Sequence, residues 1–245
     1  MIIALPQIKT QIARYSGNIN SDIVSFKKLA DADAVHGGMS SPSKMPGLSY
    51  SIPASRCITG GQLRNVAGSA CFNCYAADDW SWAKQGGHFT RYAFDNVKKA
   101  LERRYQSLFD SRWVPAMIFS IMRSKRGNFM RWHDSGDLQS PDHLFNICQV
   151  AVNTPQSKHW LPTREYNFIR NLDFQIPQNL VIRVSAHMID KKAPKEFFNT
   201  STIASNESQL KPADFLCCAY TRGHVCGDCR ACWDNKVQNV AYLQH

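Results

Sequence analysis

Three cysteines at two-residue spacing, Cys226, Cys229 and Cys232, stand near the carboxyl end of the chain. A run of this kind lets one compact loop present three sulfurs to a cube of iron, while a fourth thiolate comes from elsewhere in the chain. Cys217 and Cys218 precede the run. On an extended backbone their side chains point to opposite faces, so we expect only one of them to be the fourth ligand and favour Cys217. The spacing therefore predicts a [4Fe–4S] cluster held by four cysteines.

Zinc is the alternative metal, because separate CxxC pairs supply four thiolates in tetrahedral geometry. In this run the middle residue, Cys229, belongs to both pairs, and that overlap suits a cluster better than two zinc sites. The nine cysteines are an odd number, and the amino terminus lacks the residue order of a signal peptide. Both features argue against a disulfide framework and favour metal-bound thiolates in a reducing compartment.

A second group, Cys57, Cys71 and Cys74, offers only three thiolates. Three ligands leave one iron of a cubane open to a substrate or cofactor, whereas a fourth cysteine closes the site and suits it to electron transfer. Both groups could also contribute to a single cluster, so the sequence leaves one or two clusters open. Cys148 stands alone in the apolar segment 144–151, where we expect a small buried hydrophobe.

Other polar residues gather directly after the expected strands. His133, Asp134 and Asp137 are candidate catalytic residues that could face a substrate, although Asp-Ser-Gly-Asp is also favourable turn chemistry. Arg164 and Arg222 are candidate cofactor-binding residues, which could hold an anionic group or pair with the aspartates.

Three further residues have simpler interpretations. His187 and His224 are expected to hydrogen-bond locally rather than ligate metal. Trp233, directly after the last cysteine, could shield a cluster from water or pack in the core.

These residues must be positioned by an α/β scaffold. Strands are expected at 48–52, 128–132, 159–161, 180–185 and 214–219. Helices are expected at 91–108, 114–123, 141–152, 164–171 and 194–199. This alternation predicts a parallel sheet, closed as a barrel or open. Because the carboxyl ends of parallel strands meet at one face, the polar residues after them should share one mouth.

One folded domain is expected from 245 residues of which 44% are hydrophobic. Residues 1–47 are rich in turn-forming residues and should form an irregular segment, followed by a single cluster-binding domain at 48–245. A cysteine-rich loop should lie near its carboxyl end. No run of about 18 apolar residues occurs, so we expect no membrane partner.

The formal net charge of +10 raises the chance of a polyanionic partner such as nucleic acid. The basic residues are scattered, which is also typical of a solvated surface. The aromatic residues Trp80, Trp82 and Tyr92 near Arg91 make a zinc-stabilised nucleic-acid-binding protein one alternative function.

Separated motifs in this chain resemble the phage-encoded gene product 88 family from about residue 48 to the end. The motifs are Cys71–Ala76, Arg131–Asp137, Trp160–Arg164, Pro177–Ser185 and Cys226–Trp233. The resemblance implies a virus-encoded protein working in the cytoplasm of an infected bacterial host.

The cysteine plan is more distantly similar to that of the radical S-adenosylmethionine (SAM) enzymes. That resemblance implies a partial (β/α) barrel, a three-cysteine cluster after the first strand, SAM as a cofactor, and an auxiliary cluster at the carboxyl-terminal cysteines. Here thirteen residues separate the first two cysteines, Cys57 and Cys71. The leading expectation is a [4Fe–4S] protein with a redox or electron-transfer role and an unknown redox partner or small-molecule substrate. A radical-SAM-like enzyme is the other alternative.

Overall fold

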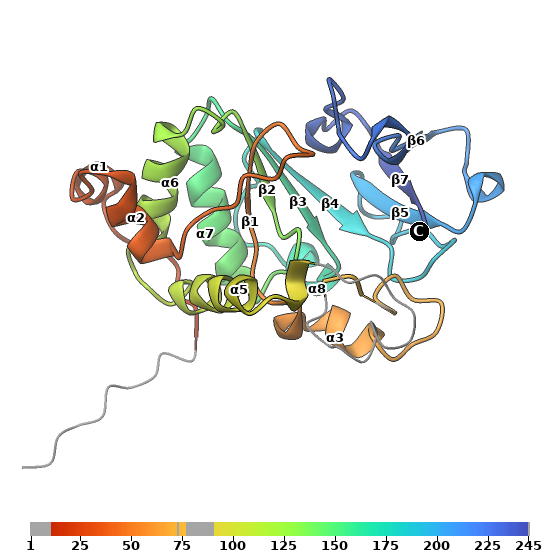
Figure 1. Ribbon diagram of the computed structural model, residues 1–245, viewed down its shortest axis with the longest axis horizontal. Helices are drawn as coiled ribbons and strands as arrows, with labels where there is room; N and C mark the ends of the chain where they lie inside the picture. Colours follow the sequence, from red (N-terminus) through yellow and green to blue (C-terminus); the bar gives the residue numbers. More distant parts are fainter. Residues whose placement is uncertain (1–10, 73, 77–90, 245) are drawn as a thin grey trace, which may run out of the picture.

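The computed structural model describes residues 11–72, 74–76 and 91–244. Within these residues, seven strands form one sheet in the order β1-β2-β3-β4-β5-β7-β6, and neighbouring strands run parallel (Figure 1). The strands are β1 Leu48–Tyr50, β2 Phe129–Trp132, β3 Lys158–Thr163, β4 Leu180–Ser185, β5 Thr200–Ala204, β6 Asp214–Leu216 and β7 Asn239–Leu243. The predicted α/β class with a parallel sheet is confirmed. The described strands do not close into a barrel, because β1 and β6 are the two edges.

Helices cover one face of the sheet, at its β1 to β4 side (Figure 1). The described helices are α1 Ile19–Ile23, α2 Leu29–His36, α3 Thr59–Leu63, α5 Asp95–Ser107, α6 Trp113–Arg123, α7 Pro141–Val152 and α8 Tyr166–Arg170, of which α3 lies below the ends of the strands in Figure 1. Helix α7 begins where Ser140 accepts a hydrogen bond from the His143 N–H, and Pro141 occupies the first turn. Its apolar residues pack with those of α6 against Met130 and Trp132 of β2. No helix of the described residues is long and apolar enough to cross a bilayer.

Short turns of 3-10 helix complete the described elements. They are η1 Ala54–Arg56, η2 Arg91–Ala93, η3 Glu207–Gln209, η4 Tyr220–Arg222 and η5 Ala231–Trp233.

The expectation of an irregular segment at 1–47 needs correction, because α1 and α2 lie within it. Ala32 and Val35 of α2 are buried against Ala116 and Phe119 of α6, so this segment forms part of the core. The expected helix at 194–199 is absent, and the expected helix at 91–108 is divided into η2 and α5.

The second face of the sheet carries polar side chains and is covered by loops. Strand alternation directs Met130 and Trp132 to the helices, so Arg131 between them points to the opposite face. Arg183 of β4 and Trp160 of β3 share this second face. The loop between β6 and β7 lies across it, with the indole N–H of Trp233 donating to the Met130 carbonyl at 2.9 Å.

Candidate functional site

The carboxyl-terminal cysteines lie together beside the second face of the sheet. A tight turn, in which Cys229 N–H donates to the Cys226 carbonyl at 3.0 Å, brings two of them close, and Gly227 adopts the positive φ of 51° that this turn requires. Burial raises the pKa of Cys226, and the nearby thiols of Cys217 and Cys229 raise it further. Burial also raises the pKa of Cys232 to about 11, with Cys217 again adding to the effect. The four cysteines predicted as one ligand set are therefore neighbours, and we call them the carboxyl-terminal set.

Arg183 holds the loop that carries this set. Its guanidinium donates to the carbonyl oxygens of Ala231, Cys232 and Asp234 at 2.7, 3.1 and 2.8 Å, and to that of Val237 at 2.9 Å. Five directed N–H groups make arginine suited to fixing several carbonyls at once. The loop backbone is thus anchored to the middle of β4.

Trp233 packs in the core, which is one of the two roles expected for it. It is buried and packs edge-to-face on Trp160 and Phe129, with ring centroids 5.2 and 5.5 Å apart, so it belongs to the core. Cys226 and Cys232 pack against the same cluster. One side of the carboxyl-terminal set is consequently shielded by an apolar wall.

Three further cysteines gather at the carboxyl ends of the strands. Burial raises the pKa of Cys57, and Asp137, Cys74 and Cys71 raise it further, so these groups lie near one another. A Cβ placed on Gly60 would lie 3.5 Å from Cys71 Sγ and 3.6 Å from Cys57 Sγ, so the two sulfurs are at most about 7 Å apart. We call Cys57, Cys71 and Cys74 the amino-terminal set.

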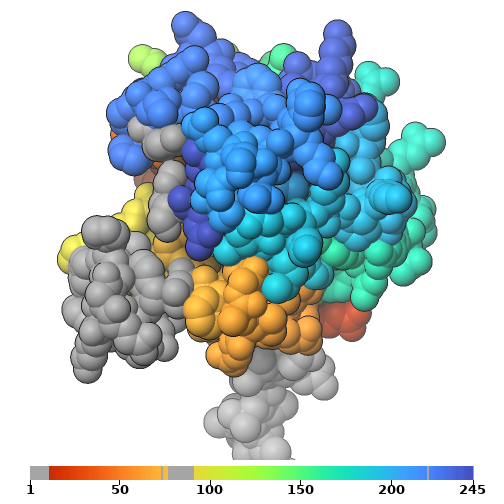
Figure 2. All heavy atoms as spheres, turned by 90° about the vertical axis from the view of Figure 1, so that its right-hand side faces the viewer, coloured from red at the N-terminus to blue at the C-terminus, as the bar shows by residue number. Residues whose placement is uncertain are grey.

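Residues that follow β3 and β4 position this second set. Glu165 accepts hydrogen bonds from the N–H and hydroxyl of Thr59 at 2.9 and 2.7 Å, which fixes the start of α3. The His187 carbonyl accepts from Ala70 N–H at 2.8 Å, directly before Cys71. In Figure 2 the segment that carries the amino-terminal set is orange and lies in the lower part of the face. The segment that carries the carboxyl-terminal set is blue and lies in the upper part.

Both sets have the donor chemistry of thiolate-bound metal. All nine cysteines are free thiols in the structure. Among the described residues, no group of three or more His, Cys, Asp or Glu side chains is arranged to hold a metal ion. In a [4Fe–4S] cubane each cysteine thiolate binds a different iron. The cysteine sulfurs therefore stand further apart than those of a zinc site, where all four bind one ion at a Zn–S distance of about 2.3 Å. Gly60 also leaves open the space beside Cys57 and Cys71 that a side chain would fill. Thiolate donors of this kind are the ones that iron–sulfur clusters and zinc sites use.

The predicted catalytic residues separate rather than converge. Asp137 turns toward β3, where it accepts from the Thr163 hydroxyl at 2.7 Å and the Arg164 N–H at 2.9 Å. Burial raises its pKa to about 6, although these hydrogen bonds oppose the shift. It lies beside Cys57 of the amino-terminal set. His133 is buried in the core, where burial lowers its pKa to about 3 and neither ring nitrogen has a partner among the described residues.

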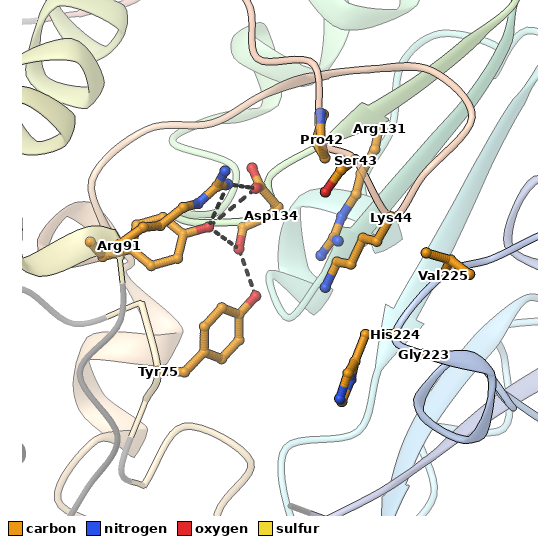
Figure 3. A pocket seen from close by; sticks show the side chains of 11 residues that line it. Pro42, Ser43, Lys44, Tyr75, Arg91, Arg131, Asp134, Gly223, His224 and Val225 are labelled. Carbon is orange, nitrogen blue, oxygen red and sulfur yellow. Dashed lines mark hydrogen bonds and ion pairs between the residues drawn. The ribbon is translucent and has the colours of Figure 1, made fainter.

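Asp134 faces a separate cavity of about 350 Å³ on the second face (Figure 3). Its carboxylate accepts hydrogen bonds from Arg91 and from the Tyr92 hydroxyl, the latter at 3.1 Å. The cavity is also lined by Lys44, Tyr75, Arg131 and His224. Sequence reasoning did not identify Lys44, Tyr75 or Arg131. The position of Arg131 inside an otherwise apolar strand is the sequence signal that could have identified it.

The remaining candidates fall in different places. Arg164 lies near Cys71 and Cys57, whose thiol pKa values its charge lowers. Arg222 is exposed and lines a surface hollow together with Cys218 and Cys229. His187 bonds the Arg164 carbonyl at 2.9 Å, as expected for a locally satisfied histidine. Trp80 and Trp82 lie outside the described residues.

Comparison with known proteins gives one match. The sequence profile of the gene product 88 family matches residues 24–235. The chain belongs to this family. No curated protein and no solved structure matches the chain.

The match contains every cysteine, the cavity and most of the sheet, so the arrangement described above is that of a gene product 88 protein. It begins upstream of residue 48, where the resemblance was expected to start, and so includes α2. The comparisons give no support for the more distant resemblance to radical SAM enzymes.

Proposed function

We propose that this gene product 88 protein is an iron–sulfur protein, in which Cys217, Cys226, Cys229 and Cys232 hold a [4Fe–4S] cluster with a redox or electron-transfer role. The observation that supports this most is the meeting of four free, part-buried thiols from two segments of the chain. A bound cluster would accept and donate one electron at a time.

Cations beside the thiols favour their ionised, metal-binding form. The positive charges of Lys44 and Arg230 lower the pKa of Cys226 against the effect of burial. Those of Arg183 and Arg131 do the same for Cys232, as does a hydrogen bond with Tyr242. A set of four thiolates concentrates negative charge, and nearby cations stabilise it in a partly buried site. The free thiols also suit the reducing cytoplasm of a bacterial host infected by a phage, where we propose that the protein works.

The test is metal analysis of the full chain purified without oxygen. Iron and acid-labile sulfide in near-equal amounts are expected, with a brown colour. The double variant Cys226→Ser, Cys229→Ser should lose most of this iron. Cys148→Ala is the matched control, because Cys148 is a buried core residue on α7 and should leave the iron content unchanged. A colourless protein that contains only stoichiometric zinc would contradict the proposal.

A second candidate function is a radical-SAM-like enzyme. The observation in its favour is that the three thiols of the amino-terminal set follow β1 at the carboxyl edge of a parallel sheet. Three ligands would leave one iron open to SAM. Reduced protein incubated with SAM should then produce 5′-deoxyadenosine, and replacement of Cys57, Cys71 and Cys74 by serine should abolish the product. A wild-type protein that produces no 5′-deoxyadenosine would contradict the enzyme hypothesis.

A further inference from the structure

The cavity beside Asp134 carries more positive than negative charge. Figure 3 shows the side chains of Lys44 and Arg131 directed into one space, with Arg91 and Asp134 on its other side. Arg91 forms an ion pair with Asp134. In the described part of the chain, neither Lys44 nor Arg131 has a carboxylate within ion-pair distance. Three cations against one carboxylate leave an excess of two positive charges.

The contacts of Arg131 fix its guanidinium in place but do not neutralise its positive charge. Its guanidinium lies 4.7 Å from the centre of the Trp160 ring and donates to the Met45 sulfur at 3.7 Å. The guanidinium also forms a hydrogen bond with the Tyr75 side chain. These contacts are weak compared with an ion pair, and the buried Nε of Arg131 has no hydrogen-bond partner among the described residues. The group is therefore pre-organised for an anion that approaches from the cavity.

The other walls of the cavity are aromatic. The rings of Tyr75 and Tyr92 meet edge-to-face with centroids 5.9 Å apart, and the Tyr75 hydroxyl donates to the Asp134 carbonyl at 2.7 Å. A volume of about 350 Å³ exceeds what a bare inorganic anion fills. The site is thus built for an anion attached to an organic body.

We propose that this cavity binds a small phosphate monoester, with the phosphate between Lys44 and Arg131 and the organic part against Tyr75 and Tyr92. A phosphate monoester carries about −1.5 to −2 charges at neutral pH, which matches the excess of two. Its charge is compact, as the convergence of Lys44 and Arg131 on one space requires. A dicarboxylate of equal charge separates its two anionic groups and fits that convergence less well.

The site lies between the two cysteine sets. Tyr75 directly follows Cys74, and the cavity-lining Val225 directly precedes Cys226. The Cys226 N–H donates to the carbonyl of Lys44 at 2.8 Å, so the same loop contact joins the cavity to the carboxyl-terminal set. The binding proposal rests on the charges and walls of the cavity, and it does not depend on the presence of a cluster.

Isothermal titration of the anaerobically purified full chain tests this proposal. The probes are phenyl phosphate, inorganic phosphate and succinate, at equal ionic strength in a phosphate-free buffer. Phenyl phosphate should bind one-to-one and more tightly than inorganic phosphate, and succinate should bind at least about 10-fold more weakly. Arg131→Gln and Lys44→Gln should each weaken phenyl phosphate binding about 10-fold or more, because each removes a charge-assisted hydrogen bond.

Arg112→Gln is the matched control, since Arg112 is an exposed arginine paired with Asp110 outside the cavity. Lys44 lies on a loop, so its variant gives a result even where Arg131→Gln fails to fold. The proposal would be overturned if the wild-type protein did not bind phenyl phosphate. It would also be overturned if both cavity variants bound phenyl phosphate as tightly as the wild type does, or if the wild type bound succinate as tightly as phenyl phosphate. Iron content measured on the same samples separates this outcome from the iron–sulfur proposal.

Discussion

Cys217 and Cys218 are adjacent in sequence but differ in their surroundings. Cys217 donates its N–H to the Ala241 carbonyl at 2.8 Å, which continues the pairing of β6 with β7, and its thiol lies near Cys226 and Cys232. Cys218 lines the surface hollow that also contains Arg222 and Cys229. The pairing with β7 is what directs one of the two thiols toward the carboxyl-terminal set.

Serine substitutions at these two positions should therefore differ in effect. Cys217→Ser is expected to lose most of the bound iron, because it removes one of four thiolates. Cys218→Ser is the matched control and should retain the wild-type iron content. Iron and sulfide analysis of both variants, purified without oxygen, checks this. Loss of iron from Cys218→Ser alone would reassign the fourth ligand.

The closeness of the carboxyl-terminal cysteines could be predicted from the sequence because it follows from their local spacing. Cys226, Cys229 and Cys232 lie within seven residues of one loop, so they must be close together whatever the rest of the fold is. Lys44 and Arg131 meet only through the contact of separate segments, and no local pattern joins them. For this reason the cavity could not be predicted from the sequence.

At the scale of elements, the turn after β2 directs His133, Asp134 and Asp137 to different places, although they are close in sequence. Gly136 adopts φ +78° within this turn, and a Cβ there would lie 2.8 Å from the carbonyl oxygen of Ile52. The Ser135 hydroxyl donates to that same oxygen at 3.0 Å, and the Ile52 N–H donates to the Ser135 carbonyl at 3.2 Å. The turn is thus pressed against the segment that leads from β1 to the amino-terminal set.

Gly136→Ala should destabilise the fold by about 2–4 kcal/mol, from about 1 kcal/mol of backbone strain plus the clash with Ile52. Gly38→Ala is the matched control. Gly38 has a similar φ of +84°, but a Cβ there meets no atom within 4 Å, so only the strain of about 1 kcal/mol is expected. Urea unfolding of both variants measures the difference. An equal decrease in the free energy of unfolding in the two variants would show that the close approach to Ile52 does not contribute to the destabilisation.

Secondary structure was predictable where periodicity was strong. Helix α7 at Pro141–Val152 and strand β4 at Leu180–Ser185 have the predicted bounds, because the apolar spacing and the Ser-Pro start of α7 leave little ambiguity. Strand β5 was missed because Thr200–Ala204 is mostly polar or small, and it forms through pairing with β4 and β7. Helix α2 was missed for a related reason, since its stability comes from packing on α6 rather than from its composition.

For the molecule as a whole, buried neutral histidines should make the fold sensitive to acid. Burial lowers the pKa of His36 to about 4 and the pKa of His133 and His159 to about 3, and it lowers that of His143 well below its usual value. A histidine with a lowered folded pKa stabilises the protein above its unfolded pKa of about 6.5, and this contribution is lost as the pH falls. Asp137, with its pKa raised to about 6, acts in the opposite direction but is a single group.

The free energy of unfolding is therefore expected to fall steeply from pH 6.5 toward pH 4. Each histidine contributes on the order of 1.4 kcal/mol per pH unit in this range. Denaturant unfolding at neutral and acidic pH checks this, and His224→Gln, which alters an exposed histidine, should leave the pH dependence unchanged. A free energy that is constant or rises toward acid would contradict the assignment of these histidines as neutral.

The central claim is that the carboxyl-terminal set holds iron that can be reduced. Electron paramagnetic resonance of anaerobically purified, dithionite-reduced protein tests it most directly. The wild-type protein should give the signal of a reduced [4Fe–4S] cluster, which should be absent in the Cys226→Ser, Cys229→Ser variant and present in Cys148→Ala. A wild-type protein that gives no signal, and whose thiols bind zinc alone, would contradict it.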